Sequence, residues 1–587
     1  MTTAAVRRPR PPSWVPGLTA VGGIGLALST LLVLGFALAG VHAGPVTWAG
    51  LLGGTVWDPV GGVFGAASMV YGTVAVSALS LLIAVPLGWA AAVGLSEHVP
   101  PRLARPLRTG VELLAAVPSI VYGLVGIALV RPLVASVGDV PGGDSLLAAG
   151  LVLGVMVLPT VVAVSVDALA AVPAGVREAA AALGLTRSEV VRSAVLPLAR
   201  PGLRAAVLLG LARALGETIA VFLVIGRADG RLPRPGHVLQ SLFEPGQTLT
   251  TKLGGPEPVL AGAVGPHRAA LSALALLLLG TVALTTVLGA GGLRRRGTGA
   301  RHRPTRAHRL RSTRDVVRRG VRLAAVALPL MLLGGIVTLL VVRGHLALTP
   351  SFWTTPSQGA SGGGVRDQVV GTLLLVLAAA VVALPVGTGL GLLLGEYAPA
   401  RLRRGLRTAT LTVGGVPTIL LGLAGYAVFA VGLGWGKSWL AGALVLAVVV
   451  VPVVALTTAT RLDALPDGHR EAAAAAGLTR MQQVRALLLP HAAPAALTGL
   501  LLGLARAAGE TAPLLFTATV FAGATSLPHR VVQSPVESLP THIFALAQDA
   551  SEQAAVDAAW GSALVLVMIA GALLLTALPL RRRLETR

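Results

Sequence analysis

Two nearly identical segments place an arginine and a glutamate four residues apart in an apolar setting. GLARALGET begins at Gly210 and GLARAAGET begins at Gly503. Residues four apart share one face of a helix, so each arginine can pair with its glutamate. Ionisable groups at membrane depth usually face the protein interior or a water-filled path. The residues expected to line such a path are Arg213, Glu217, Thr218, Arg506, Glu510 and Thr511.

Two interpretations of these pairs are open. In the first, Arg213 and Arg506 attract an anion, and the glutamates hold them in place when the path is empty. In the second, each pair is a structural ion pair near a helix end. A related hypothesis concerns selectivity: protonated phosphate can donate a hydrogen bond to Glu217 or Glu510, whereas sulfate at neutral pH has no proton to donate.

A charged, alanine-rich segment precedes each pair. REAAAALGLTRSEVVRSAVLPLARPG begins at Arg177, and REAAAAAGLTRMQQVRALLLPHAAPA begins at Arg470. In the first copy, Gly184 is expected to close one helix and a capping box to start the next. Pro197 is expected to end the unit. The second copy repeats this pattern, so the sequence predicts two helix–turn–helix units, here called the knobs.

Composition identifies an integral membrane protein. The 587 residues are 54% hydrophobic and 12% charged, with a mean hydropathy of +0.80. There is no Cys, which excludes disulfides and thiol chemistry. The net charge of +23 comes largely from arginines in short loops and at the termini, as the positive-inside rule expects, so we expect no nucleic-acid partner. The histidines show no metal-ligand spacing, and we expect no metal or other cofactor.

Twelve stretches are long and apolar enough to span a membrane, which predicts an all-α fold. They are expected near residues 18–41, 69–94, 109–131, 146–168, 203–225, 268–291, 323–343, 369–394, 408–431, 438–459, 496–520 and 560–580. An even number of spans returns the chain to its starting side. We therefore expect both termini and both knobs in the cytoplasm.

The chain is a tandem duplication. Glu178, Gly184 and Pro197 recur as Glu471, Gly477 and Pro490 at a shift of 293, and upstream positions recur at a shift of 299. Both halves have the same orientation, which is a parallel repeat with an expected path between the halves. The expected regions are a basic N-terminus (1–17), a first permease domain (18–293), an Arg-rich linker (294–322), a second permease domain (323–580) and a basic tail (581–587). Like charges, Gly and Pro predict little fixed structure in the linker.

The knobs carry a family resemblance. The EAA, the Gly six residues after its Glu and the Pro nineteen after it resemble the EAA loop of ABC-transporter permeases. AVPSIVYGL, RALGETIAV, TLTTKL and PHRAAL resemble the PstC-type permease of bacterial phosphate uptake. GVPTILLGL, RAAGETAPLLF, SLPTHIF and AAWGSALVLV resemble its PstA-type partner. The chain thus resembles both subunits fused end to end.

The resemblance implies a type I ABC permease (MetI-like) fold in the bacterial plasma membrane. It implies import of phosphate delivered by an extracytoplasmic binding protein, with ATP hydrolysed by two copies of a separate ATPase, so the chain itself is not expected to be an enzyme. It places the path residues above on the phosphate route. The residues that it assigns to contact with the ATPase are Glu178, Ala179, Ala180, Gly184, Glu471, Ala472, Ala473 and Gly477.

Two alternatives stay open at this stage. One is an ABC permease for another oxyanion, such as molybdate or sulfate. The other is a twelve-helix secondary transporter, which would have similar hydropathy but no need for two cytoplasmic knobs.

Overall fold

The computed structural model describes residues 14–41, 47–234, 236–261, 265–294, 311–357, 363–520, 527–548 and 553–586. The expected basic N-terminus as far as residue 13, linker residues 295–310 and the last residue of the tail lie outside these ranges.

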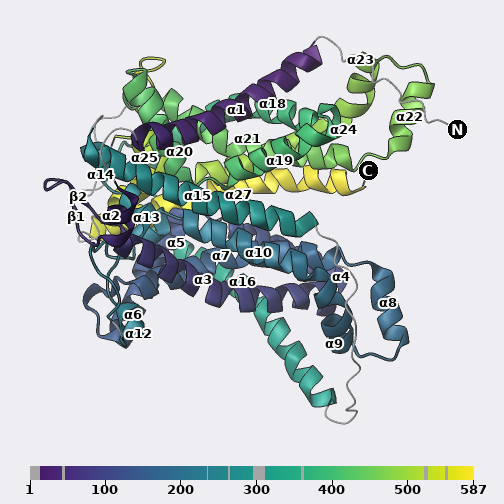
Figure 1. Ribbon diagram of the computed structural model, residues 1–587, viewed down its shortest axis with the longest axis horizontal. Coiled ribbons are helices and arrows are strands. Elements are labelled where there is room, and N and C mark those ends of the chain that lie inside the picture. Colours follow the sequence, from purple (N-terminus) through teal and green to yellow (C-terminus); the bar gives the residue numbers. More distant parts are fainter. Residues whose placement is uncertain are drawn as a thin grey trace.

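Long apolar helices make up most of the molecule and run roughly side by side (Figure 1). Among the described residues, eleven helices are long and apolar enough to cross a membrane, or twelve if one bent pair of helices forms a single span. The helices that carry the first-half spans are α1 (Trp14–Val41), α3 (Ala67–Val93), α5 (Ser119–Val125), α7 (Leu146–Ala170), α10 (Leu196–Gly216) and α15 (Pro266–Arg294). Those of the second half are α16 (Arg311–Gly344), α18 (Arg366–Leu392), α20 (Thr418–Gly425), α21 (Trp439–Asp463), α24 (Leu489–Ala508) and α27 (Gln553–Thr586).

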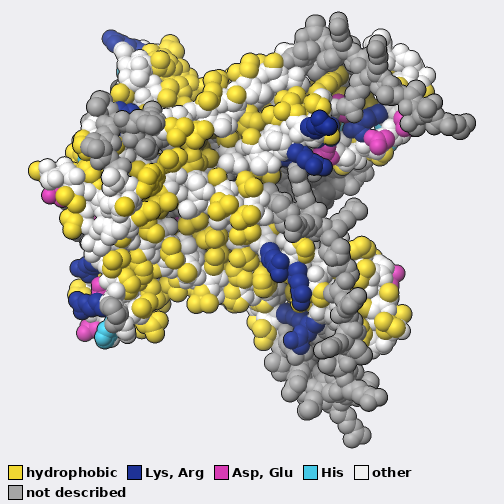
Figure 2. Space-filling view, in the orientation of Figure 1, with side chains coloured by type: hydrophobic (Ala, Val, Ile, Leu, Met, Phe, Trp, Pro, Cys, Tyr) yellow, Lys and Arg dark blue, Asp and Glu magenta, His cyan; other side chains and the backbone are white. Residues whose placement is uncertain are grey.

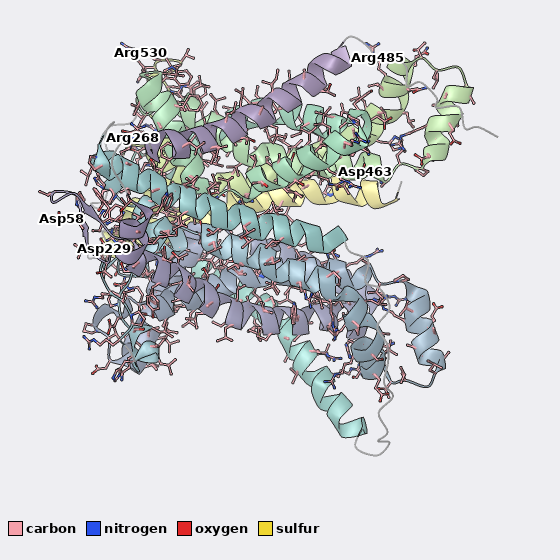
Figure 3. The ribbon with its side chains drawn as sticks, in the orientation of Figure 1. Asp58, Asp229, Arg268, Asp463, Arg485 and Arg530 are labelled. Carbon is pink, nitrogen blue, oxygen red and sulfur yellow. The ribbon has the colours of Figure 1, made fainter. Side chains whose placement is uncertain are left out.

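Charged side chains gather at the two ends of this bundle. Figure 2 shows a hydrophobic surface across the middle, with Lys, Arg, Asp and Glu at either end. Asp58 and Arg268 lie at one end, and Asp463 and Arg485 lie at the other (Figure 3). A central apolar band between polar ends is the surface that a bilayer requires. The expected all-α membrane fold is confirmed.

The only strands among the described residues form a hairpin of two strands with two residues each. β1 (Trp57–Asp58) pairs antiparallel with β2 (Val63–Phe64). It follows the short helix α2 (Trp48–Gly53) and marks the end of the molecule opposite the knobs (Figure 1). We call the two ends the hairpin end and the knob end.

The third span of each half is broken at a proline, where the sequence predicts a continuous helix. In the second half α19 (Ala400–Gly415) and α20 meet at an angle of 89°. In the first half α4 (Pro101–Ala116) stops before Pro118 and α5 follows it. Val117 and Val416 have extended ψ values of 128° and 131°, because a residue before proline is disfavoured in the helical region.

The knobs form as predicted in one respect and differ in another. α8 (Ala174–Ala182) ends at Gly184, whose φ of +76° suits glycine, and Thr186 and Glu189 form the capping box that starts α9 (Arg187–Val190). Pro197, however, does not end the unit. A π-helical turn, Val191–Val195, joins α9 to α10, so residues 187–216 form one long helix. Pro197 lies directly after this turn, inside the continuous helix rather than at its end.

The second knob has the same construction. α22 (Asp467–Ala475) ends before Gly477, whose φ is +72°. α23 (Arg480–Gln483) then continues through the π-helical turn Val484–Leu488 into α24. Pro490 likewise lies directly after this turn, inside the helix rather than at a break.

The linker is more ordered than expected at its second end. Residues 311–322 belong to α16, which runs without a break from Arg311 into the seventh span. Arginine has a high helix propensity, and a helix that is already nucleated in a span extends at low cost. The expectation of little fixed structure is wrong for this part.

The two halves are intertwined by their first spans. α1 packs against α18 of the second half, and α16 packs against α3 and α4 of the first. Glycines allow the first crossing: a Cβ on Gly389 would lie 2.0 Å from the carbonyl oxygen of Leu18. Small residues at helix crossings are the usual means of close packing in membranes.

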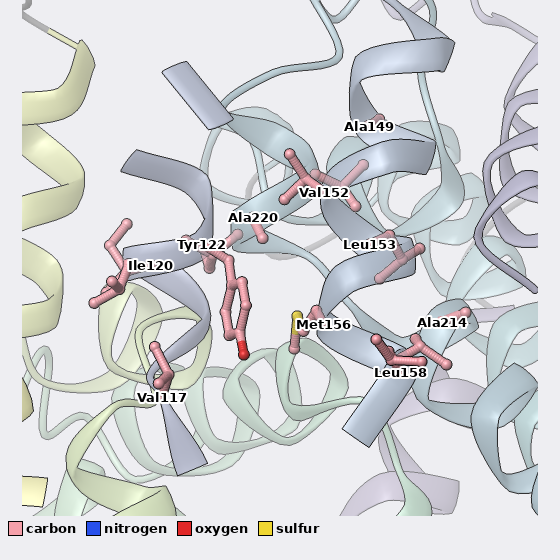
Figure 4. Close-up of a cluster of buried hydrophobic side chains, with 14 of the residues drawn as sticks. Val117, Ile120, Tyr122, Ala149, Val152, Leu153, Met156, Leu158, Ala214 and Ala220 are labelled. Carbon is pink, nitrogen blue, oxygen red and sulfur yellow. The ribbon is translucent and has the colours of Figure 1, made fainter. Parts of the chain in front are cut away.

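The buried core reaches the region where spans three, four and five meet. Figure 4 shows Tyr122 of α5 beside Met156 of α7, with Ala214 of α10 close to the same helix. The Tyr122 hydroxyl donates a 2.6 Å hydrogen bond to the carbonyl oxygen of Leu114, at the break between α4 and α5. This core fixes the position of the α10 end that carries the first arginine–glutamate motif.

Candidate functional site

One cavity of about 570 Å³ lies between the two halves. Its lining comes from both repeats, including α5, α7 and α10 of the first and α20, α21 and α24 of the second. The predicted path residues in its wall are Arg213, Glu217, Thr218, Arg506 and Glu510. The sixth, Thr511, is buried but is not part of the lining. The duplication thus brings both charged motifs to a single space.

The cavity forms where broken helices from the two halves meet. α10 ends at Gly216 and α24 ends at Ala508, followed by Gly509, so both fifth spans stop earlier than the sequence predicts. A Cβ on Gly216 would lie 3.5 Å from Pro417 of the other half, and a Cβ on Gly509 would lie 2.7 Å from Pro118. The glycine of each motif therefore contacts the proline break of the opposite repeat.

The two motifs are not equivalent in their contacts. Arg506 forms an ion pair with Glu510, with 3.4 Å between Nε and Oε1, and its side chain is about half exposed. The described contacts include no ion pair between Arg213 and Glu217, so that predicted pairing is wrong. Glu217 lies just beyond the helix end with an extended ψ of 131°, and its Oε1 accepts a 3.3 Å hydrogen bond from the Ala220 amide.

Several buried polar atoms at the site lack a partner among the described residues. They are Nε of Arg213 and the Oγ1 atoms of Thr218, Thr286 and Thr511. Native proteins leave few buried donors unpaired. A multivalent oxygen acceptor in the cavity would satisfy the arginine and the hydroxyls that face it, and an anion would also offset the charge of Arg213.

α15 and α27 also contribute to the cavity wall. From α15 the wall includes Thr286, and from α27 it includes Leu574 and Ala577. Toward the hairpin end, the rings of Phe222 and Phe544 meet across the halves with 5.3 Å between their centroids. Phe222 belongs to α11 (Ile219–Phe222) and Phe544 to α26 (Leu539–Gln548).

A buried lysine holds the segment behind the site. Lys252 of α13 (Leu249–Leu253) has a side chain only 3% exposed, and its Nζ lies 2.8 Å from Asp229 and 2.9 Å from Glu257. Burial alone would raise the pKa of the Glu257 carboxyl. The bond and charge of Lys252, together with a hydrogen bond from Trp57 and the charge of His267, outweigh burial and hold that pKa below its usual value. Thr250 of the same helix donates a 2.8 Å bond to the Glu217 carbonyl oxygen.

The matching segment of the second half has no such cation. Thr372 accepts from the Leu539 amide as Thr73 accepts from the Leu249 amide, which makes α26 the counterpart of α13. His542 then stands in the place of Lys252, and burial lowers the pKa of His542 to about 4, so it is neutral.

Most of the expected ATPase-contact residues are exposed on the knobs. Glu178, Ala179 and Gly184 are exposed on the first knob, and Glu471, Ala472 and Gly477 on the second. Ala180 is buried and Ala473 is half-buried, so these two form the inner face of each knob. Figure 1 shows α8 and α22 standing away from the bundle at the same end.

Sequence reasoning missed several residues of the site. Ser119, Thr286 and Glu112 line the cavity, and Glu112 accepts a 3.0 Å bond from Arg108. Ser119 directly follows Pro118 within the AVPSIVYGL segment, which was the one available signal. Thr286 lies in an apolar span with no motif around it, and only the packing of the two halves brings it to the cavity.

Comparison with known proteins assigns the family. The model of the binding-protein-dependent transport system inner membrane component matches residues 84–237 and 387–585, once in each half. The chain belongs to this family. The two matches agree with the tandem duplication seen in the sequence.

Individual relatives agree with this assignment. The chain is 36% identical over 278 residues to the phosphate transport system permease protein PstC of Mesorhizobium japonicum, covering 43% of this chain and 82% of the relative. It is 36% identical over 253 residues to PstC of Haemophilus influenzae, covering 40% and 77%. It is also 41% identical over 197 residues to the probable ABC transporter permease protein YqgH of Bacillus subtilis, covering 33% and 62%. No solved structure matches.

The relatives confirm the expected resemblance to PstC-type permeases. They are named as transport permeases rather than as enzymes, as expected. The fold, the two family matches and these names together make the chain an integral membrane permease.

Proposed function

We propose that this chain forms the complete translocation path of an ATP-driven phosphate importer. The observation that carries the proposal is the shared cavity, in which Arg213 has an unpaired Nε and faces a second motif with Arg506. Phosphate offers several acceptor oxygens and negative charge, which suit arginine guanidinium groups. The PstC names of the relatives support the same substrate.

The two ends of the molecule would meet different partners. We assign two copies of a cytoplasmic ATPase to the knob end, one on each knob, and an extracytoplasmic phosphate-binding protein to the hairpin end. This orientation puts both termini in the cytoplasm of a bacterial cell.

Reconstitution tests the proposal directly. The purified chain, a candidate phosphate ATPase and a phosphate-binding protein are placed in liposomes, and labelled phosphate uptake is followed with and without ATP. We expect uptake only with ATP and all three components. Uptake that continues without ATP hydrolysis would support a secondary transporter instead.

Substitutions on the knobs test the proposed ATPase contact separately from the path residues. Glu471→Lys or Gly184→Arg should abolish both ATPase attachment and uptake, because each places a bulky cation on an exposed knob surface. Gly184 also has a positive φ that a side chain would strain. If attachment and uptake survive both changes, the coupling assignment is wrong.

Competition experiments decide between oxyanions. We expect excess phosphate, but not sulfate or molybdate, to suppress uptake. Glu217→Gln and Glu510→Gln test the carboxylate hypothesis, because an amide oxygen keeps an acceptor but loses the charge that favours a protonated ligand. An unchanged preference for phosphate over sulfate in both variants would refute this hypothesis.

A further inference from the structure

Each knob is tied to the end of the second span by an ion pair that occurs twice in the molecule. Nη2 of Arg177 lies 3.2 Å from Oε1 of Glu97. Nε of Arg470 lies 3.1 Å from Oε2 of Glu396. The glutamates belong to the π-helical turns Gly94–His98 and Leu393–Tyr397, which extend α3 and α18.

The same arginines also bond the end of the fourth span. Arg177 donates to the carbonyl oxygens of Leu169 at 2.7 Å and Val172 at 2.5 Å. Arg470 donates to Leu462 at 3.0 Å and Leu465 at 2.7 Å. These carbonyls lie where α7 and α21 end, and those of Leu169 and Leu462 also accept from the Val172 and Leu465 amides. One guanidinium thus joins three elements: the knob, the second span and the fourth span.

We call these two sets of contacts, centred on Arg177 and Arg470, the arginine joints. Their geometry is more constrained than that of a surface ion pair. The carboxylates of Glu97 and Glu396 are only 12% and 15% exposed, and both arginine side chains are 27% exposed. The planar guanidinium uses several fixed donors at once, which resists rotation. Glu178 and Ala179, on the same short helix as Arg177, are exposed. The arginine therefore anchors a short helix whose next two residues face outward.

We propose that Arg177 and Arg470 are positioning residues that transmit displacement of the knobs to the second and fourth spans of their own halves. This inference rests on the proposed coupling to an ATPase. The continuous helices 187–216 and 480–508 carry the motion to the fifth spans, and the arginine joints carry it to α3, α7, α18 and α21. The spans of one half then move as a unit rather than the fifth span alone.

The test compares two pairs of isosteric substitutions in the full chain. Glu97→Gln with Glu396→Gln removes the carboxylate charge from both arginine joints and leaves the arginines in place. Asp167→Asn with Asp463→Asn is the matched control, because these residues form ion pairs with Arg108 and Arg407 at the same end without contacting the knobs. Each protein is reconstituted with ATPase and binding protein, and phosphate transported per ATP hydrolysed is measured together with ATPase retention.

We expect the glutamine pair to retain the ATPase but to lower phosphate transported per ATP by about fivefold or more, the lower range of a typical coupling energy. The control should keep the wild-type ratio. Arg177→Lys with Arg470→Lys should also lower the ratio, because lysine cannot bridge the carboxylate and two carbonyls together.

Three outcomes would overturn the inference. They are a glutamine pair with the wild-type ratio, a control that lowers the ratio equally, and a glutamine pair that loses the ATPase altogether. A wild-type chain with no ATP-dependent uptake would instead overturn the proposed function, and this inference with it.

Discussion

At the scale of single residues, the two copies of one motif have different contacts. Arg506 is neutralised by Glu510, whereas the Nε of Arg213 is buried without a partner. The repeats differ at one position within the motif and also around it: Tyr122 stands in the first half at the place that Leu421 occupies in the second. Arg213 therefore has a buried donor that a bound anion would satisfy, whereas Arg506 already has a carboxylate partner.

We predict that Arg213→Lys reduces phosphate uptake more than Arg506→Lys. Lysine keeps the charge but loses the Nε donor and the planar fork. Losing a hydrogen bond to a charged group costs about 1.5–3 kcal/mol, which corresponds to about a ten- to hundredfold lower initial rate at low phosphate. Rates in proteoliposomes check this, normalised to the amount of folded protein. Equal losses in the two variants would contradict the asymmetry.

A second residue-scale prediction concerns Lys252, which neutralises two acids behind the site. Lys252→Met leaves Asp229 without its ion pair and Glu257 with the His267 ring but no ammonium group beside it, and breaking a buried pair costs on the order of 3 kcal/mol. Because the pKa of Glu257 is lowered in the folded protein, its stabilising effect is present above its unfolded pKa of about 4.3 and is lost as pH falls through the lower folded value. Thermal unfolding in detergent at pH 7 and at acid pH measures both effects.

The two proteins should differ most at neutral pH and converge as the pH falls below about 4.3. Arg231→Met is a suitable control, because its ion pair with Glu244 is long and exposed. A Lys252→Met protein as stable as the wild type at neutral pH would refute the proposed role of the lysine.

At the scale of elements, residue patterns predicted where helices lie but not where they break. The EAA knobs, the capping box and the apolar lengths were readable because each depends on neighbouring residues. The breaks at Gly216 and Gly509 lie against Pro417 and Pro118 of the other half, a contact that no local pattern contains. For the same reason Thr286 was missed as a cavity residue, and Pro197 was given a helix-ending role that the π-helical turn before it removes.

We predict that the α1–α18 crossing fails on substitution of one glycine. In Gly389→Leu, the Cβ would lie 2.0 Å from the Leu18 carbonyl oxygen, so the helices must separate. Overpacking of this kind costs about 1–3 kcal/mol or more. Gly334→Leu is the matched control, since this glycine lies on α16 with no atom within 4 Å. A thermal shift assay should show destabilisation only for the first variant, and equal midpoints would contradict the close crossing.

At the scale of the whole molecule, the first spans exchange places between the halves. α1 packs on α18, and α16 packs on α3 and α4, so each half includes a helix from the other half's part of the sequence. Composition and repeat length predicted two domains with a path between them, but boundaries along the sequence do not reveal this exchange. The covalent link is therefore not what holds the halves together in the folded state.

We predict that the chain stays assembled after the linker is cut. A protease site inserted between residues 299 and 300 is cleaved in detergent, and size-exclusion chromatography then shows whether the fragments co-elute. We expect one peak containing both fragments, because the exchanged helices bury apolar surface that separation would expose to water or lipid. The same cut in the Gly389→Leu background should release more of the fragments, since it weakens one of the two crossings. Fragments that separate in the wild-type background would show that the linker, rather than helix exchange, holds the permease together.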